Sequence, residues 1–183
     1  MANLRTNNLS GEQGQNAYRG SVFFDGNSTG LRAVESDSNL TFGTGDFTIE
    51  FWILRNNSDN AVFLDWRHTT GGAQGVRITL YADGNLKFFN NGGNQISGSD
   101  PLTTNSWHHV ALARGSSSTR LFVNGVQFGS TYSDSSDYEG PLDSGGIYIG
   151  RFGGGGYDTK AYISNLRIVK GTALYTSDFT PPQ

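Results

Sequence analysis

Glutamate side chains are the first candidates for chemistry in this sequence, because paired carboxyl groups cleave glycosidic bonds. In retaining glycosidases the two carboxyl groups stand about 5 Å apart. The chain has four glutamates, which lie far apart in the sequence: Glu12, Glu35, Glu50 and Glu139. Glu50 stands alone between two apolar neighbours. We therefore predict no catalytic residue and no enzymatic activity; a glycan hydrolase with unrecognised acids is the weakest alternative.

The adjacent histidines His108 and His109 could suggest a metal-binding pair or a general base. They follow Trp107 in an apolar segment that is typical of a β-strand. Successive side chains of a strand point to opposite faces, so the two rings cannot bind one metal ion together. We interpret both histidines as structural residues.

Aromatic rings near loops are candidates for sugar binding, because the apolar faces of sugars stack on them. Five aromatic residues lie in or beside predicted loops: Trp66, Tyr132, Tyr138, Phe152 and Tyr157. They are the predicted glycan contacts, although several could instead cap the edges of the fold. Trp52 and Trp107 lie inside apolar segments, and we predict that both belong to the core.

Short β-strands separated by turns must position these residues. The odd positions of segment 47–54 are all apolar, which gives one strand an apolar face. Asn124-Gly125 separates two apolar runs and predicts a type I′ hairpin turn, because both turn positions need positive φ. The 26 glycines and the scarcity of glutamate also favour strands over helices. The sequence therefore predicts an all-β fold, a sandwich or a barrel.

Five segments, in this order, resemble the motifs of the concanavalin A-like, laminin-G-type jelly-roll domain. They are GDFTIEFW (45–52), WHHVA (107–111), LFVNG (121–125), IYIG (147–150) and ISNLRI (163–168). The resemblance implies a jelly roll, which is an antiparallel β-sandwich of two sheets, with binding carried by loops. It does not transfer a ligand, since this fold hosts many functions. The Glu-x-Asp-x-x-Glu motif of laminarinase-like relatives is absent.

The closing segment 165–182, NLRIVKGTALYTSDFTPP, carries a narrower resemblance. It is similar to the version of this domain found in tailed-phage virion proteins, particularly those of marine and cyanobacterial phages. This resemblance implies a location in the virion, after assembly in the host cytoplasm. It also implies that the partners are copies of the chain and other virion proteins.

Calcium is the one cofactor that the resemblance leads us to consider, because relatives often bind it through loop oxygens. The candidate ligands are Asp25, Asn27, Asp134 and Asp137. Asp and Asn also favour turns for reasons of backbone geometry alone. We prefer the turn interpretation for each cluster, and we predict no other cofactor.

Charge and hydropathy argue against two classes of partner. The net charge is −3 and no basic stripe is present, so we predict no nucleic-acid binding. No apolar run approaches the length of a membrane span, and the N-terminus lacks the apolar region of a Sec signal peptide. We therefore expect no membrane partner.

The chain divides into three predicted parts. Residues 1–20 are polar and form an N-terminal arm, residues 21–170 form the sandwich, and residues 171–183 form a tail that packs on the sandwich. The leading hypothesis is a non-enzymatic phage virion protein, a capsid decoration protein or a small surface appendage. It would act through contacts between subunits, to which the arm adds further contacts by strand addition or by wrapping. The alternative is a carbohydrate-binding, lectin-like module for attachment to host or environmental polysaccharide, with or without calcium.

Overall fold

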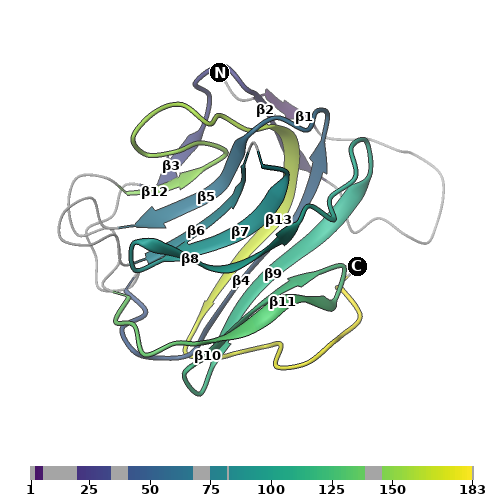
Figure 1. Cartoon of the computed structure of the whole chain (residues 1–183). Coiled ribbons are helices and arrows are strands. Elements are labelled where there is room, and N and C mark those ends of the chain that lie inside the picture. The colour runs from purple at the N-terminus through teal and green to yellow at the C-terminus, as the bar shows by residue number, and fades with distance from the viewer. Residues whose placement is uncertain are drawn as a thin grey trace.

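Two antiparallel β-sheets lie face to face in the computed structural model, which confirms the predicted β-sandwich (Figure 1). The structure describes residues 3–5, 20–33, 41–67, 75–81, 83–138 and 146–182. Every strand pair in both sheets is antiparallel. Within the described residues, no helix is long and apolar enough to cross a membrane.

The order of the strands in space differs from their order in the chain. The seven-stranded sheet has the order β1 (Asn3–Arg5), β2 (Ser21–Asp25), β13 (Lys160–Lys170), β4 (Phe47–Arg55), β9 (Trp107–Gly115), β10 (Ser118–Val123) and β11 (Val126–Ser133). The six-stranded sheet has the order β3 (Leu31–Ala33), β12 (Ile147–Ile149), β5 (Ala61–Arg67), β6 (Gly75–Leu80), β7 (Asn85–Asn90) and β8 (Gly93–Ser99).

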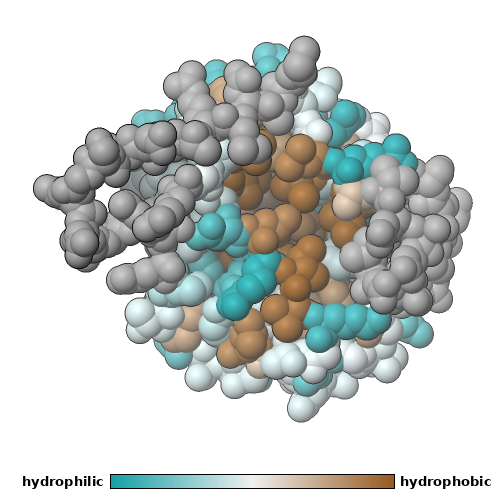
Figure 2. All heavy atoms as spheres, turned by 180° about the vertical axis from the view of Figure 1, so that it is seen from behind, coloured by the Kyte–Doolittle hydropathy of each residue, from teal (hydrophilic) through white to brown (hydrophobic). Residues whose placement is uncertain are grey.

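The core lies between the inner faces of the two sheets. The odd positions of β4 from Phe47 to Ile53 are at most 1% exposed, as the alternation predicts. At one edge of the sandwich, β11 packs against β8. At the other edge, an apolar cleft of about 260 Å³ separates β2 and β13 from β3 and β12. Apolar residues also gather in the middle of the face seen in Figure 2.

The hairpin between β10 and β11 turns at Asn124-Gly125, where both residues have positive φ (52° and 79°). The Asn124 side chain adds two links to β9. Its carbonyl oxygen accepts a 2.9 Å bond from the His109 backbone N–H, and its amide donates to His108 Nδ1 at 3.0 Å. The turn is therefore bound to the neighbouring strand as well as to its own.

A buried carboxylate ties the β9–β10 hairpin to the segment that follows β11. Asp134 is 0% exposed, and its Oδ2 accepts 2.6 Å bonds from the hydroxyls of Thr119 and Tyr138. The guanidinium of Arg114 lies 3.5 Å from the same oxygen and donates to the Asp134 carbonyl at 2.9 Å. Burial, followed by the charge of Asp134, raises the pKa of Tyr138, so its hydroxyl stays protonated and donates.

Replacing Asp134 should destabilise the fold strongly. Asp134→Ala leaves the buried Arg114 cation unpaired, which costs about 3–5 kcal/mol in free energy of unfolding. Urea denaturation measures this loss. Asp137→Ala is the matched control, because Asp137 is exposed three residues away, and it should change stability by less than about 0.5 kcal/mol. Equal losses in the two variants would contradict the assignment.

Candidate functional site

The C-terminal segment 171–182 crosses the outer face of the seven-stranded sheet, the face turned away from the core. Tyr175 and Phe179 stack on each other, with ring centroids 3.5 Å apart, and pack against Phe122 and two alanines of β9. The Phe179 N–H donates to the Gly125 carbonyl at 2.8 Å. We call residues 171–182 the C-terminal strap.

Glu50 lies under this strap, on the same outer face. The odd positions of β4 fill the core, so the intervening even positions, including Glu50, point outward. Its carboxylate is nevertheless 3% exposed. Oε2 accepts bonds from the Tyr175 hydroxyl at 2.7 Å and from His109 Nε2 at 3.1 Å, and Oε1 accepts from Arg167. Within the described residues, none of its hydrogen-bond partners is a second acid.

A bulge in β13 brings Arg167 opposite Glu50. The register shifts between Ser164 and Arg167, where Asn165 has a φ of 51°. Without the extra residue, Leu166 would take the position opposite Glu50. One inserted residue therefore places a cation beside the carboxylate in place of an apolar side chain.

The hydrogen bonds around Glu50 settle its charge. Burial alone would raise its pKa, but bonds from His109, Tyr175 and Arg167 outweigh burial, and the pKa lies below its usual value. Burial and the bond to Glu50 raise the pKa of Tyr175 to about 12. At neutral pH the glutamate is therefore an anion and the tyrosine a neutral donor. A general acid needs the opposite shift of its carboxyl pKa.

His109 completes the cluster as a donor through its Nε2. Its Nε2 faces the Glu50 carboxylate, while its Nδ1 is buried and has no hydrogen-bond partner. A proton on Nδ1 would be buried without an acceptor, so the proton belongs on Nε2. Its ring makes edge-to-face contacts with the rings of Trp52 and Phe179, with centroids 5.2 Å and 5.7 Å apart. The prediction that Trp52 belongs to the core is wrong: Trp52 is half-buried on the outer face.

A groove of about 380 Å³ opens beside this cluster. It is lined by Glu50, Trp52, His109, Asn165, Leu166, Arg167 and Pro182. This combination of an aromatic ring, a half-exposed guanidinium and an amide can hold a polar ligand with apolar faces. The groove can bind, but the carboxylate beside it is already saturated by donors. We call it the Glu50 groove.

The predicted glycan contacts do not form one site. Trp66 is 2% exposed and packs against Phe42 in the core, and Tyr138 is also 2% exposed, so the prediction that these two rings lie at the surface is wrong. Tyr132 packs against core residue Phe88. Trp66 lies in the core because it belongs to β5, two residues after the buried Leu64, so that its side chain points to the same inner face. Its position near the end of the strand made it look like a loop residue in the sequence.

Phe152 and Tyr157 do lie together, with ring centroids 6.1 Å apart. They flank the glycine-rich loop that follows β12, a strand of the six-stranded sheet. Tyr157 is 48% exposed and Phe152 is half-buried. Of the five predicted rings, these two are the ones that the fold places beside each other outside the core.

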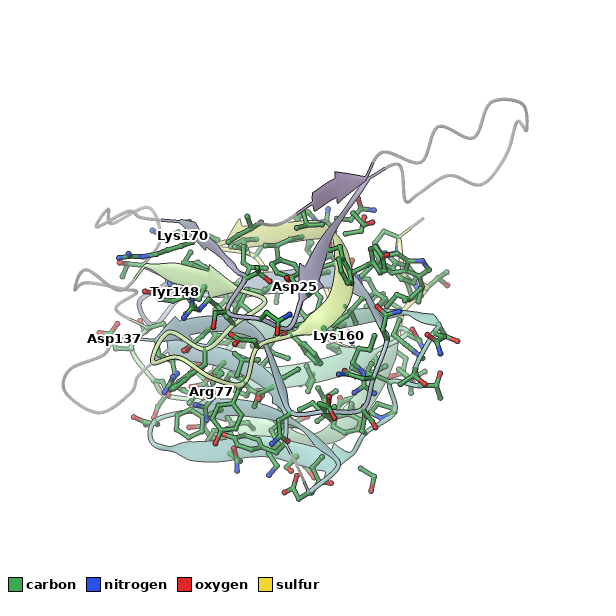
Figure 3. The ribbon with its side chains drawn as sticks, turned by 90° about the horizontal axis from the view of Figure 1, so that it is seen from above. Asp25, Arg77, Asp137, Tyr148, Lys160 and Lys170 are labelled. Atoms are coloured by element: carbon green, nitrogen blue, oxygen red, sulfur yellow. The ribbon has the colours of Figure 1, made fainter. Side chains whose placement is uncertain are left out.

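The predicted calcium ligands do not converge either. Asp25 and Asp137 lie in separate parts of the molecule (Figure 3). Asp25 Oδ1 accepts bonds from Thr29 and from the Asn27 N–H, which lower its pKa, so this cluster is a turn. Asp134 is buried and already bound by protein donors, so its prediction as a calcium ligand is wrong. Within the described residues, no three carboxylate or imidazole groups gather around one point.

Comparison with known proteins identifies the class of this fold. The family model described as the concanavalin A-like lectin/glucanases superfamily matches residues 24–175, and the chain belongs to this family. A search of curated protein sequences gives no match.

Solved structures share the fold at low sequence identity. A sialidase of Trypanosoma rangeli in complex with sialic acid has a TM-score of 0.65 and 12% identity over 85% of this chain. The match spans only 26% of the sialidase. Domain 4 of AbnA, an extracellular arabinanase of Geobacillus stearothermophilus, in complex with arabinotriose, has a TM-score of 0.60 and 16% identity. There the match covers 94% of this chain and 83% of the domain.

A third similar structure is an assembly. The heptameric pentraxin of Limulus polyphemus has a TM-score of 0.59 and 18% identity, over 81% of this chain and 74% of the pentraxin. These identities are low enough that the likenesses show a shared fold and nothing about ligands.

The strap should depend on pH through Glu50. A carboxyl group whose folded pKa is lowered stabilises the fold above its ordinary pKa, near 4.3, and loses that effect as the pH falls. Glu50→Gln should therefore lower the free energy of unfolding by about 1.5–3 kcal/mol at pH 7, the worth of hydrogen bonds to a charged group. The difference from the parent should shrink below about pH 4. Urea denaturation across this range measures it, and a pH-independent difference would contradict the account.

Proposed function

We propose that the chain is a non-catalytic carbohydrate-binding module and that the Glu50 groove is its binding site. The observation that carries this proposal is the meeting of Trp52, Asn165 and Arg167 at one open groove. An indole face offers apolar contact to a sugar ring, and guanidinium and amide groups offer hydrogen bonds to hydroxyls. Family membership and the arabinotriose-bound domain, a separate protein with this fold, are consistent with it.

The same geometry argues against catalysis. Most glycoside hydrolases use a carboxylic acid that is protonated before the reaction and a second carboxylate close by. Burial alone would raise the pKa of Glu50, but its hydrogen bonds lower the pKa by more than burial raises it, so the carboxyl group stays ionised. Its described partners are a histidine, an arginine and a tyrosine. We infer that Glu50 positions the wall of the groove.

A second role, in a phage virion, is supported by the edge of the seven-stranded sheet. Asn3–Arg5 adds to β2 as a short antiparallel strand. Pairing of the same segment with a neighbouring copy would join subunits by strand addition, which suits a decoration protein or a small appendage. Light scattering of the full chain and co-sedimentation with phage particles test this role. A monomer that never sediments with particles would contradict it.

Removing the indole should weaken sugar binding. A glycan array identifies the ligand, with arabinotriose as the first probe in calorimetry. Trp52→Ala should weaken binding about threefold to tenfold, since stacking on an aromatic ring is worth about 0.5–1.5 kcal/mol. Trp107→Ala is the matched control, because Trp107 is half-buried on the neighbouring strand outside the groove lining, and it should leave affinity unchanged. Equal losses in both variants, or an array without binding, would contradict the proposal.

A further inference from the structure

The outer face of the six-stranded sheet carries a row of charged and aromatic side chains. Strand register aligns Arg32, Tyr148, Asp65, Arg77 and Phe89 across β3, β12, β5, β6 and β7. Residues paired in this way point to the same face of a sheet. Five strands span about 19 Å across the sheet. Figure 3 shows Arg77 and Tyr148 on the same side of the molecule.

Arg77 is a buried cation in the middle of this row. It is 7% exposed, and its guanidinium lies over the Phe89 ring at 4.1 Å. Its Nη2 donates to the Tyr81 hydroxyl at 2.7 Å, while its Nε is buried without a hydrogen-bond partner. Within the described residues, Arg77 forms no salt bridge.

The carboxylate opposite Arg77 in the strand register, that of Asp65, is already bonded to other groups. Asp65 holds Arg67 through two bonds, at 2.5 and 2.8 Å, and accepts a third from the Gly153 N–H at 3.1 Å. Among the described residues, this carboxylate is therefore bonded to the Arg67 guanidinium and not to that of Arg77. Burial and the charge of Arg67 both lower the pKa of Arg77, because both disfavour the charged form of its guanidinium. An added anion would offset this effect.

The glycine-rich loop after β12 places aromatic rings beside these cations. Phe152 lies 5.0 Å from the Arg67 guanidinium and 5.7 Å from that of Arg77. Tyr157 lies next to Phe152 and is 6.1 Å from the Tyr81 ring. Because Tyr157 is half exposed, its ring can still stack on a ligand. The surface thus offers both a positive charge and an aromatic platform.

We propose that Arg67, Arg77, Phe152 and Tyr157 form a second binding site, which takes an acidic polysaccharide with carboxylate or sulfate groups. The anionic groups pair with the two guanidiniums, and a sugar ring lies against Tyr157. Charge complementarity selects this ligand, because the positive excess is local in a chain whose net charge is −3. The site lies on the other sheet from the Glu50 groove and does not depend on sugar binding there.

Affinity electrophoresis of the full chain tests the proposal. The probes are polygalacturonate and dextran sulfate, with neutral dextran as the control polymer. We expect binding to both acidic polymers, none to dextran, and weaker binding at about 300 mM than at about 20 mM NaCl, because salt screens the ion pairs. Equal retardation by dextran, or tighter binding of a single-stranded oligonucleotide than of polygalacturonate, would overturn the proposal.

Variants then locate the binding. Arg67→Gln should weaken binding about tenfold, the worth of one charge-assisted contact. The exposed change Tyr157→Ala should weaken binding about threefold to tenfold, because it removes an aromatic contact. Arg120→Gln removes the same charge from the other sheet and should have no effect. Thermal melting checks that each variant is folded. Equal losses in Arg67→Gln and Arg120→Gln would show non-specific attraction and overturn the proposal. A loss confined to Trp52→Ala would place the polymer in the Glu50 groove and equally overturn it.

Discussion

The anchoring of Glu50 is the interaction on which the outer face of the seven-stranded sheet depends. A carboxylate that is 3% exposed must be paired with donors, or its burial would cost several kcal/mol. Its donors come from three places: β9, β13 and the C-terminal strap. One charge thus holds two strands and a terminal segment together. It also fixes one wall of the Glu50 groove, which Trp52 and Arg167 line.

The buried charges on the two outer faces of the sandwich have different kinds of partner. On the seven-stranded sheet, the Glu50 carboxylate accepts hydrogen bonds from three protein side chains, one of them the cation of Arg167. The groove beside it therefore offers hydrogen-bonding side chains but little unpaired charge. On the six-stranded sheet, Arg77 is buried with an aromatic ring and a hydroxyl in place of a carboxylate. The ligands that we propose differ accordingly: a neutral sugar for the first surface and an acidic one for the second. The core between them is apolar and can position both faces.

The fold was predictable because its signals are local. Alternation along residues 47–54 and the Asn124-Gly125 turn need only near neighbours, and the structure has both where the sequence predicts them. The partners of Glu50 are 59 to 125 residues away, and the bulge that selects Arg167 exists only in the assembled sheet. The prediction of Trp66 as a surface residue was wrong because it relied on nearness to a loop, whereas the side chain points to the inner face of its strand. Strand alternation alone could have placed Glu50 and Trp52 on one outer face.

If Glu50 anchors the strap, its carboxylate and the Tyr175 hydroxyl must be energetically coupled, and a double-mutant cycle between Glu50→Gln and Tyr175→Phe measures this coupling most directly. The free energies of unfolding of the parent, both single variants and the double variant give the coupling between the two side chains. A direct bond from the Tyr175 hydroxyl to a buried carboxylate predicts a coupling of at least about 1 kcal/mol. Additive effects, with a coupling within about 0.3 kcal/mol of zero, would contradict the account.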